Sequence, residues 1–305
     1  MKLSSIIFIW GMLLCSSLNL FAQQTDFKNF ETRESTLDER WELTSESSQG
    51  TFVVVPYKPI YILPGRWSNR PNKLPTSLNP DNVAKIPNDY NNFEARFQLS
   101  IKTKITSGLL FGKGDIWLGF TQTANWQVFN EKLSRPFREL NYEPEVIFNY
   151  PLPSDASIFG LKPKMVGLAL NHQSNGKSLP YSRSWNRVVF HAAFEYRDLS
   201  FTIRPWIRFS EKFDTDDNPQ IGNYIGVGDA TFVYTHKEQV FSLLVRSNMR
   251  LNNRFKGYAD FTWSYPIKGN LKAILQVTHG YGETLIDYNY KQTTVGLGVS
   301  LIEWL

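Results

Sequence analysis

The sequence predicts an all-β protein, a twelve-stranded antiparallel transmembrane β-barrel. Apolar and polar residues alternate with a period of two along most of the chain. No segment after the first 22 residues offers 18 continuous apolar residues, which excludes a helical membrane protein. Aromatic residues make up 15% of the chain, yet the mean hydropathy is −0.32. That combination is typical of a barrel whose strands alternate lipid-facing and lumen-facing side chains.

The chain begins with a segment typical of a secretory signal peptide. Lys2 precedes an apolar run, and the small residue Ala22 precedes polar residues. We therefore expect cleavage near Ala22, with a signal peptide over residues 1–22 and one barrel domain over residues 23–305. A transmembrane anchor is the alternative, but polar residues interrupt the run and no stop-transfer flank follows it.

Cysteine content and charge exclude several classes of function. Cys15 is the only cysteine and lies in the expected signal peptide, so the exported chain would carry none. Disulfides, cysteine-ligated zinc and cysteine catalysis are thereby excluded. The net charge is +5, and the Lys and Arg residues are scattered rather than clustered. This distribution argues against a nucleic-acid partner.

Twelve segments carry the alternation expected of strands. In the segment over 199–209, apolar side chains such as Ile203 and Ile207 alternate with Arg204 and Arg208. A soluble β-sandwich also alternates, but charged residues at mid-strand favour a hydrated lumen, and the many aromatic residues favour interfacial girdles. The expected strands lie near residues 53–62, 92–103, 115–127, 142–150, 162–172, 185–196, 199–209, 222–235, 238–249, 255–264, 270–281 and 292–303.

An even number of strands places both chain ends on the same side of the membrane. With both ends in the periplasm, the connections after strands 1, 3, 5 and 7 are extracellular. These connections cover residues 63–91, 128–141, 173–184 and 210–221, and they include the longest in the chain. Long external loops and short periplasmic turns are typical of outer-membrane barrels.

Polar residues stand on the lipid-facing side of two neighbouring strands. His172 and Ser174 share the parity of the apolar residues Leu168 and Leu170, and Asn186 shares the apolar parity of the next strand. An unpaired polar group facing lipid costs roughly 1–3 kcal/mol or more, so three of them on one patch require an explanation.

Hydrolysis of a lipid ester would explain this patch. Ser174 would be the nucleophile, His172 the general base, and Asn186 the acceptor that orients the imidazole. The alternative is an interfacial group of polar side chains without chemistry.

The stretch "NHQSNGKSLPYSRSWNR", residues 171–187, resembles the active-site signature of the outer membrane phospholipase A family. The similarity extends to "RPFRELNYEPE" at 135–145, "DTDDNP" at 214–219 and "GYGETLIDYNY" at 280–290. The resemblance implies a twelve-stranded barrel that acts as a calcium-dependent, dimeric lipase. It also implies that Ser174, His172 and Asn186 are the catalytic triad.

The resemblance also implies calcium ligands. They are the hydroxyl of Ser182, the main-chain oxygen of Lys177, and Ser134 contributed by the partner chain. A second, monomer-type calcium site would use Asp217, but Leu179 stands where its other aspartate is expected. The alternative for Asp217 is a simple acidic external loop.

We therefore expect an outer-membrane phospholipase that hydrolyses acyl ester bonds of membrane glycerophospholipids, with its active site at the outer leaflet. The resemblance implies phospholipase A1, A2 and lysophospholipase activity and a homodimer, with Gln122 as a polar contact in the dimer seam. The alternatives are a non-enzymatic porin or structural barrel, and a lipid A deacylase. The latter class resembles a smaller barrel with an acidic third triad member.

Overall fold

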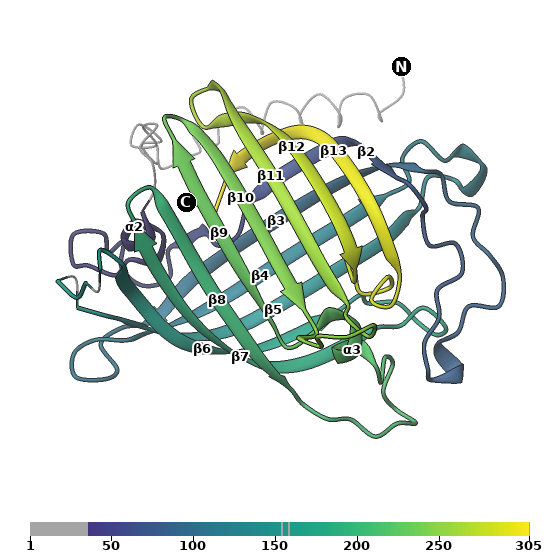
Figure 1. Ribbon diagram of the computed structural model, residues 1–305, viewed down its shortest axis with the longest axis horizontal. Coiled ribbons are helices and arrows are strands. Elements are labelled where there is room, and N and C mark those ends of the chain that lie inside the picture. Colours follow the sequence, from purple (N-terminus) through teal and green to yellow (C-terminus); the bar gives the residue numbers. More distant parts are fainter. Residues whose placement is uncertain (1–35, 154, 158, 305) are drawn as a thin grey trace, which may run out of the picture. The chain divides into compact units, whose positions relative to one another are not determined.

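The computed structural model describes residues 36–153, 155–157 and 159–304 (Figure 1). The expected signal peptide, residues 1–22, lies outside the described residues. Across the described ranges no helix is long and apolar enough to cross a membrane. The helical elements are α2 (Leu37–Trp41), α3 (Ile221–Ile225) and the 3-10 turns η2 (Pro80–Asn82) and η3 (Glu131–Leu133).

Strands account for most of the described chain. They are β1 (Val54–Pro56), β2 (Ile60–Ser68), β3 (Phe93–Thr106), β4 (Asp115–Trp126), β5 (Phe137–Pro151), β6 (Lys162–Ser174), β7 (Ser184–Tyr196), β8 (Leu199–Arg208), β9 (Gly228–His236), β10 (Gln239–Ser247), β11 (Gly257–Lys268), β12 (Leu271–Tyr281) and β13 (Lys291–Ile302).

The twelve strands from β2 to β13 form a closed antiparallel barrel (Figure 1). Each strand pairs with the next along the chain, and β13 returns to pair with β2 through partners such as Val295 and Trp67. The short strand β1 adds to β3, with Val54 opposite Thr103. Closure satisfies the backbone groups that an open sheet edge would expose to lipid. The expected all-β, twelve-stranded fold is confirmed.

The first barrel strand differs from its expected position. A single strand was expected over 53–62, but the chain forms β1, leaves the ladder, and re-enters as β2. Pro56 and Pro59 lack the N–H groups that a continuous strand would donate. Between them, the N–H groups of Tyr57 and Lys58 donate to the carbonyl and hydroxyl oxygens of Ser100.

The expected strand over 222–235 also begins later, because its first residues form α3. Ile221 and Ile225 are buried, and they lie four residues apart, which is a helical spacing. Their side chains belong to a cluster with Trp206, Leu285 and Tyr288. Gly226 then adopts a φ of 96°, which ends the helix two residues before β9 begins.

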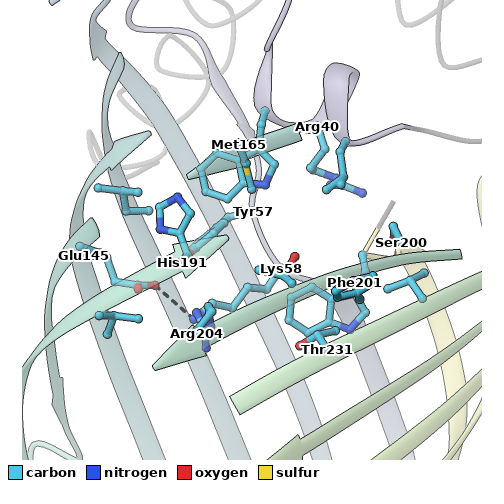
Figure 2. A pocket seen from close by; sticks show the side chains of 18 residues that line it. Arg40, Tyr57, Lys58, Glu145, Met165, His191, Ser200, Phe201, Arg204 and Thr231 are labelled. Atoms are coloured by element: carbon cyan, nitrogen blue, oxygen red, sulfur yellow. Dashed lines mark ion pairs between the residues drawn. The ribbon is translucent and has the colours of Figure 1, made fainter. Parts of the chain in front are cut away.

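The barrel interior carries charged side chains that are paired with one another. Lys58 Nζ lies 3.1 Å from Glu143 and 3.2 Å from Glu145, and the latter pair is drawn in Figure 2. Arg204 forms hydrogen bonds of 2.9 and 2.7 Å with the two oxygens of Asp229. A buried charge without a partner is costly, so these pairs hold the interior in one arrangement. The expectation of a polar inner face is met.

Helix α2 lies inside the barrel at the end opposite to the long connections, beside the pocket of Figure 2. Thr36 and Glu39 form a capping box that starts the helix. The ring of Trp41 lies 3.3 Å from Lys102 Nζ, a cation–π contact. Arg40 donates a 2.7 Å hydrogen bond to the carbonyl of Glu303 near the C-terminus. The N-terminal segment is thus tied to several parts of the wall.

Candidate active site

The outer face of β6 is apolar until its last residues. Val166, Leu168 and Leu170 are exposed, whereas the alternate residues Met165 and Ala169 are buried inside. His172 and Ser174 continue the exposed row and are half-buried. The parity expected from the sequence therefore matches the structure, which places both side chains on the outer wall.

Asn186 lies directly opposite His172 in the β6–β7 ladder. Its Oδ1 atom lies 2.8 Å from His172 Nδ1. Because an amide oxygen can only accept, Nδ1 carries the proton in this pair and Nε2 is left as an acceptor. Nε2 is the atom that a general base would use.

Ser174 occupies the same face two residues beyond His172, opposite Ser184. Among the hydrogen bonds of the described residues, none joins the Ser174 hydroxyl to the His172 imidazole. A catalytic hydrogen bond often tightens only when substrate is bound, so this geometry is compatible with a nucleophile and its base.

The inner face of the same strand pair is held by a polar and aromatic cluster. Trp185 is buried and donates a 2.8 Å hydrogen bond from Nε1 to Gln173 Oε1. The guanidinium of Arg187 lies 3.9 Å from the Trp185 ring and donates to Asn171 Oδ1 at 2.6 Å. These contacts fix the two strands whose outer faces carry His172 and Asn186.

The connection over 175–183 is held by Asn175. This buried side chain donates to the carbonyl of Tyr181 at 2.8 Å, and its oxygen accepts from the N–H of Arg183 at 3.0 Å. Gly176 has a φ of 64°, which a residue with a side chain rarely adopts. The loop that contains Lys177 and Ser182 therefore has a defined path.

Ser182 and Asp217 are in direct contact. The Ser182 hydroxyl donates to Asp217 Oδ2 at 2.7 Å, and the Ser184 hydroxyl donates to the same oxygen at 3.3 Å. Asn82 donates to Asp217 Oδ1 at 3.0 Å. Hydroxyl and carboxylate oxygens are the ligands that Ca²⁺ prefers, so this group fits the ion. In the described ranges no group of three or more His, Cys, Asp or Glu residues could hold a metal.

Among the described residues, no hydrogen bond joins the other two expected calcium ligands, Lys177 and Ser134, to Ser182 or Asp217. The Lys177 ammonium donates to the carbonyl of Arg138 and lies 3.5 Å from the Glu139 carboxylate. Ser134 is exposed in the connection between β4 and β5, directly after η3. Its exposure is compatible with a contact to a second copy of the chain.

Gln122 lies on the outer wall in line with Ser174. Gln122 is opposite Tyr142 in the β4–β5 ladder, and Tyr142 is opposite Ser174 in the β5–β6 ladder. Leu118, four residues before Gln122 on the same face of β4, is exposed and apolar. A surface that covered Gln122 would therefore adjoin the candidate site.

The first long loop was not expected to contribute to this region. Asn82, in η2, donates to the carbonyl of Ser182 at 3.0 Å, and its own carbonyl accepts from Arg183 at 2.9 Å. Burial lowers the pKa of Arg183. No local signal in the sequence predicts this contact, because about 100 residues separate the partners.

Comparisons with known proteins agree with this architecture. The family model described as phospholipase A1 matches residues 37–301. Phospholipase A1 of Salmonella typhimurium is 34% identical over 250 residues, covering 82% of each chain.

Two solved structures are also similar. One is an active-site mutant of Escherichia coli outer membrane phospholipase A, with a TM-score of 0.76 and 31% identity over 88% of this chain and 100% of that chain. The other is the Salmonella typhi outer membrane phospholipase dimer with bound calcium, with a TM-score of 0.74 and 33% identity over 86% of this chain and 96% of that chain.

Fold and comparisons together define an outer-membrane β-barrel of the hydrolase class. The chain belongs to the phospholipase A1 family. The expectation of an ester hydrolase that acts on phospholipids is thereby confirmed.

Proposed function

We propose that the chain is a calcium-dependent phospholipase whose Ser174, His172 and Asn186 hydrolyse acyl ester bonds of glycerophospholipids at the outer wall of the barrel. The observation that carries the proposal is the 2.8 Å contact between His172 Nδ1 and Asn186 Oδ1 at the end of an exposed apolar row. The E. coli relative supports it, since the active-site mutation in that solved structure replaces an asparagine by alanine.

The reaction proceeds in two steps. His172 Nε2 takes the proton of the Ser174 hydroxyl as Oγ attacks the ester carbon, and the imidazolium then protonates the departing lysophospholipid alcohol. In the second step His172 takes a proton from water, which attacks the acyl group on Oγ. The imidazolium returns that proton to Oγ as the fatty acid is released. Asn186 remains neutral and keeps the His172 proton on Nδ1 throughout.

The outer wall supplies the binding surface for an acyl chain. Leu168 and Leu170 on β6 and Phe190 on β7 are exposed, and they lie nearer the middle of the strands than His172. An acyl chain lying along them would bring its ester bond to the strand ends, where apolar wall gives way to polar loops. The longest connections extend from this end of the barrel, which supports a site at the outer leaflet.

Calcium would be held by Ser182, the carbonyl of Lys177 and Ser134 of a second copy, with Asp217 beside Ser182 as a further oxygen donor. When bound, calcium would supply positive charge that stabilises the oxyanion of the tetrahedral intermediate. A separate monomer-type site built on Asp217 has less support, because Asp217 already contacts Ser182 and Ser184.

A homodimer fits this arrangement. Gln122 and Ser174 lie in one row of cross-strand partners, so a seam over Gln122 would bring the Ser134 loop of a second copy near the site. The Salmonella typhi structure is described as a dimer with bound calcium.

The experiment that tests the proposal measures fatty-acid release by the purified protein in detergent. We expect release from phospholipid when calcium is added, loss of release when calcium is chelated, and no release by Ser174→Ala under either condition. Calcium-independent release, or release by Ser174→Ala, would contradict the proposal.

A further inference from the structure

Three neighbouring strands end their outward apolar rows with polar side chains. On β6 the row ends at His172 and Ser174, and on β7 it ends at Asn186. On β8 the exposed residues Ile203 and Ile207 are followed at the same parity by exposed Phe209 and then by Glu211. The first two rows supply the proposed triad, and the third ends beside them at Glu211.

The backbone places Glu211 beside Asn186. In the β7–β8 ladder Arg187 is opposite Arg208, and the N–H of Phe209 donates to the carbonyl of Asn186 at 2.9 Å. That bond extends the ladder to Phe209, and Glu211 lies two residues beyond it, which is the spacing of a diagonal neighbour of Asn186 on the outer face. Diagonal neighbours are within reach of long side chains.

The Glu211 side chain is half-buried and lies close enough to the Asn186 amide to interact with it. Burial raises the pKa of Glu211, as do Asp216 and Asp217, whereas Arg208 and the hydrogen bond with the Asn186 side chain lower it. Arg208 is already bound to Asp216 through two hydrogen bonds of 2.7 Å. The buried Oε1 atom of Glu211 has no hydrogen-bond partner among the described residues.

We propose that Glu211 is a positioning residue that holds the Asn186 amide with its oxygen toward His172. This inference rests on the proposed triad. An asparagine side chain can rotate by 180° and exchange its NH₂ and oxygen. A carboxylate accepts from the NH₂ but repels the oxygen, so Glu211 selects the orientation in which Oδ1 faces His172 Nδ1. The proton then stays on Nδ1, and Nε2 is free to act on Ser174.

The carboxylate would also stabilise the charge that develops during catalysis. His172 becomes an imidazolium as it takes the Ser174 proton, and an anion nearby lowers the energy of that state. Asn186 contributes no charge itself. In the row Glu211–Asn186–His172, the negative charge is carried by Glu211. It therefore lies one residue further from the apolar wall than the charge of a carboxylate at position 186 would.

The test compares Glu211→Ala, Glu211→Gln and Asp214→Asn with the wild type, as full-length protein in detergent at saturating calcium. Asp214 is an exposed acid of the same connection, so its variant removes the same charge without touching Asn186. We expect kcat to fall about tenfold or more in Glu211→Ala, with little change in KM, since a hydrogen bond to a charged group is lost. Glu211→Gln keeps the shape of the side chain and should lose less, and Asp214→Asn should match the wild type.

Two readouts separate positioning from a merely structural role. The acidic limb of the pH–rate profile should move to lower pH in Glu211→Gln, because a nearby negative charge favours protonated imidazole. In an Asn186→Ala background, Glu211→Ala should cause little further loss, because its partner is gone. The proposal would be overturned if Glu211→Ala lowered kcat in the Asn186→Ala background as much as it does in the wild type. It would also be overturned if the Glu211 variants left both the pH–rate profile and kcat unchanged.

The proposed function and this inference can fail separately. If Ser174→Ala is inactive while Glu211→Ala equals the wild type, the triad stands and the Glu211 role falls. If calcium above the concentration that saturates the wild type restores Glu211→Ala, the residue acts on the metal site and the positioning role is wrong. The ¹⁵N shifts of His172 report its tautomer without any activity, and loss of the Nδ1-protonated form in Glu211→Ala is expected. An unchanged tautomer in both Glu211 variants would refute the proposal.

Discussion

Asn186 provides an orienting hydrogen bond without a formal charge on the apolar outer wall. Its Oδ1 atom accepts from His172 Nδ1 at 2.8 Å, as a carboxylate would. A carboxylate facing hydrocarbon, however, costs on the order of 2–4 kcal/mol even on permissive scales. An amide at this position would thus reconcile the geometry of the proposed Ser–His–Asn triad with a site on the apolar outer wall.

The first prediction concerns the nucleophile and its base. Ser174→Ala should abolish ester hydrolysis, and His172→Ala should be nearly as severe, because the two residues act as a unit. Both side chains lie on the outer face and contribute nothing to the backbone ladder, so heat-modifiable mobility on gels should remain that of a folded barrel. Full hydrolytic activity of Ser174→Ala would remove Ser174 from the mechanism.

Asn186 gives the second prediction. Asn186→Ala should leave Ser174 in place and calcium binding intact. It should lose about 1–3 kcal/mol of transition-state stabilisation. Asn186→Asp should retain more activity, because a carboxylate accepts the same bond, with a shifted pH optimum. The pH–rate profiles of the three proteins decide between the alternatives. An alanine variant that matched the wild type at every pH would reduce the triad to a His–Ser dyad.

At the scale of elements, alternation predicted where the strands run but not where all of them begin. Period two identifies a face along β6 or β8, because each residue there meets lipid or lumen in turn. It fails over 53–62, where Pro56 and Pro59 interrupt the ladder. It fails again at 221–225, where apolar residues four apart pack as α3 against Trp206 and Leu285. Both errors arise where packing or a missing N–H overrides the local pattern.

The connection between β12 and β13 carries the third prediction. Burial alone would raise the pKa of Glu283, but Arg66 and Arg96 hold it below the usual range. Its carboxylate bonds to Arg66, lies 2.8 Å from Arg96 and accepts from Gln292 at 2.9 Å. A carboxylate whose folded pKa is lowered stabilises the fold at neutral pH, and this contribution is lost as the pH falls through the lowered value.

Glu283→Gln should therefore unfold more easily than the wild type at pH 7, and the difference should shrink under acidic conditions. Denaturant titrations followed by tryptophan fluorescence at both pH values measure this effect. Glu131→Gln, at an exposed ion pair with Arg135, is the matched control and should change little. An equal difference between Glu283→Gln and wild type at every pH would contradict the assignment.

At the scale of the whole molecule, the sequence predicted the outer-wall position of His172, Ser174 and Asn186, because parity alone determines it. The resemblance supplied the calcium ligands as separate groups, and only the structure shows Asp217 in contact with Ser182. Neither Asn82 nor Glu211 could be found from local spacing. The contacts of Asn82 depend on how distant loops meet above the barrel, and the position of Glu211 depends on the register between β7 and β8. A period along one strand encodes neither.

Dependence on a second copy is the fourth prediction. Activity and cross-linking yield should rise together as calcium is added, because Ser134 of one copy would complete the site of the other. Ser134→Ala should raise the calcium concentration required for half-maximal activity. A monomeric preparation that turned over at the full calcium-dependent rate would show that the site is complete within one chain.

The fifth prediction distinguishes an enzyme from a pore. Interior ion pairs and α2, with Trp41 against Lys102, occupy the lumen, so the wild-type barrel should show no steady conductance in planar bilayers. Deletion of residues 36–41 should increase the frequency of open events. Stable porin-like conductance by the intact protein would favour the non-enzymatic alternative.

The pairing of β13 with β2 has a consequence for how the protein is made. The strands at the two ends of the barrel must find each other, so every intermediate that lacks β13 has two unpaired edges. Such contacts between distant parts of a chain form slowly. Helix α2 is bound to Glu303, which follows β13, so its final position depends on residues that are synthesised after the last strand of the barrel. We therefore expect the closure of the barrel and the final placement of α2 to come late in folding.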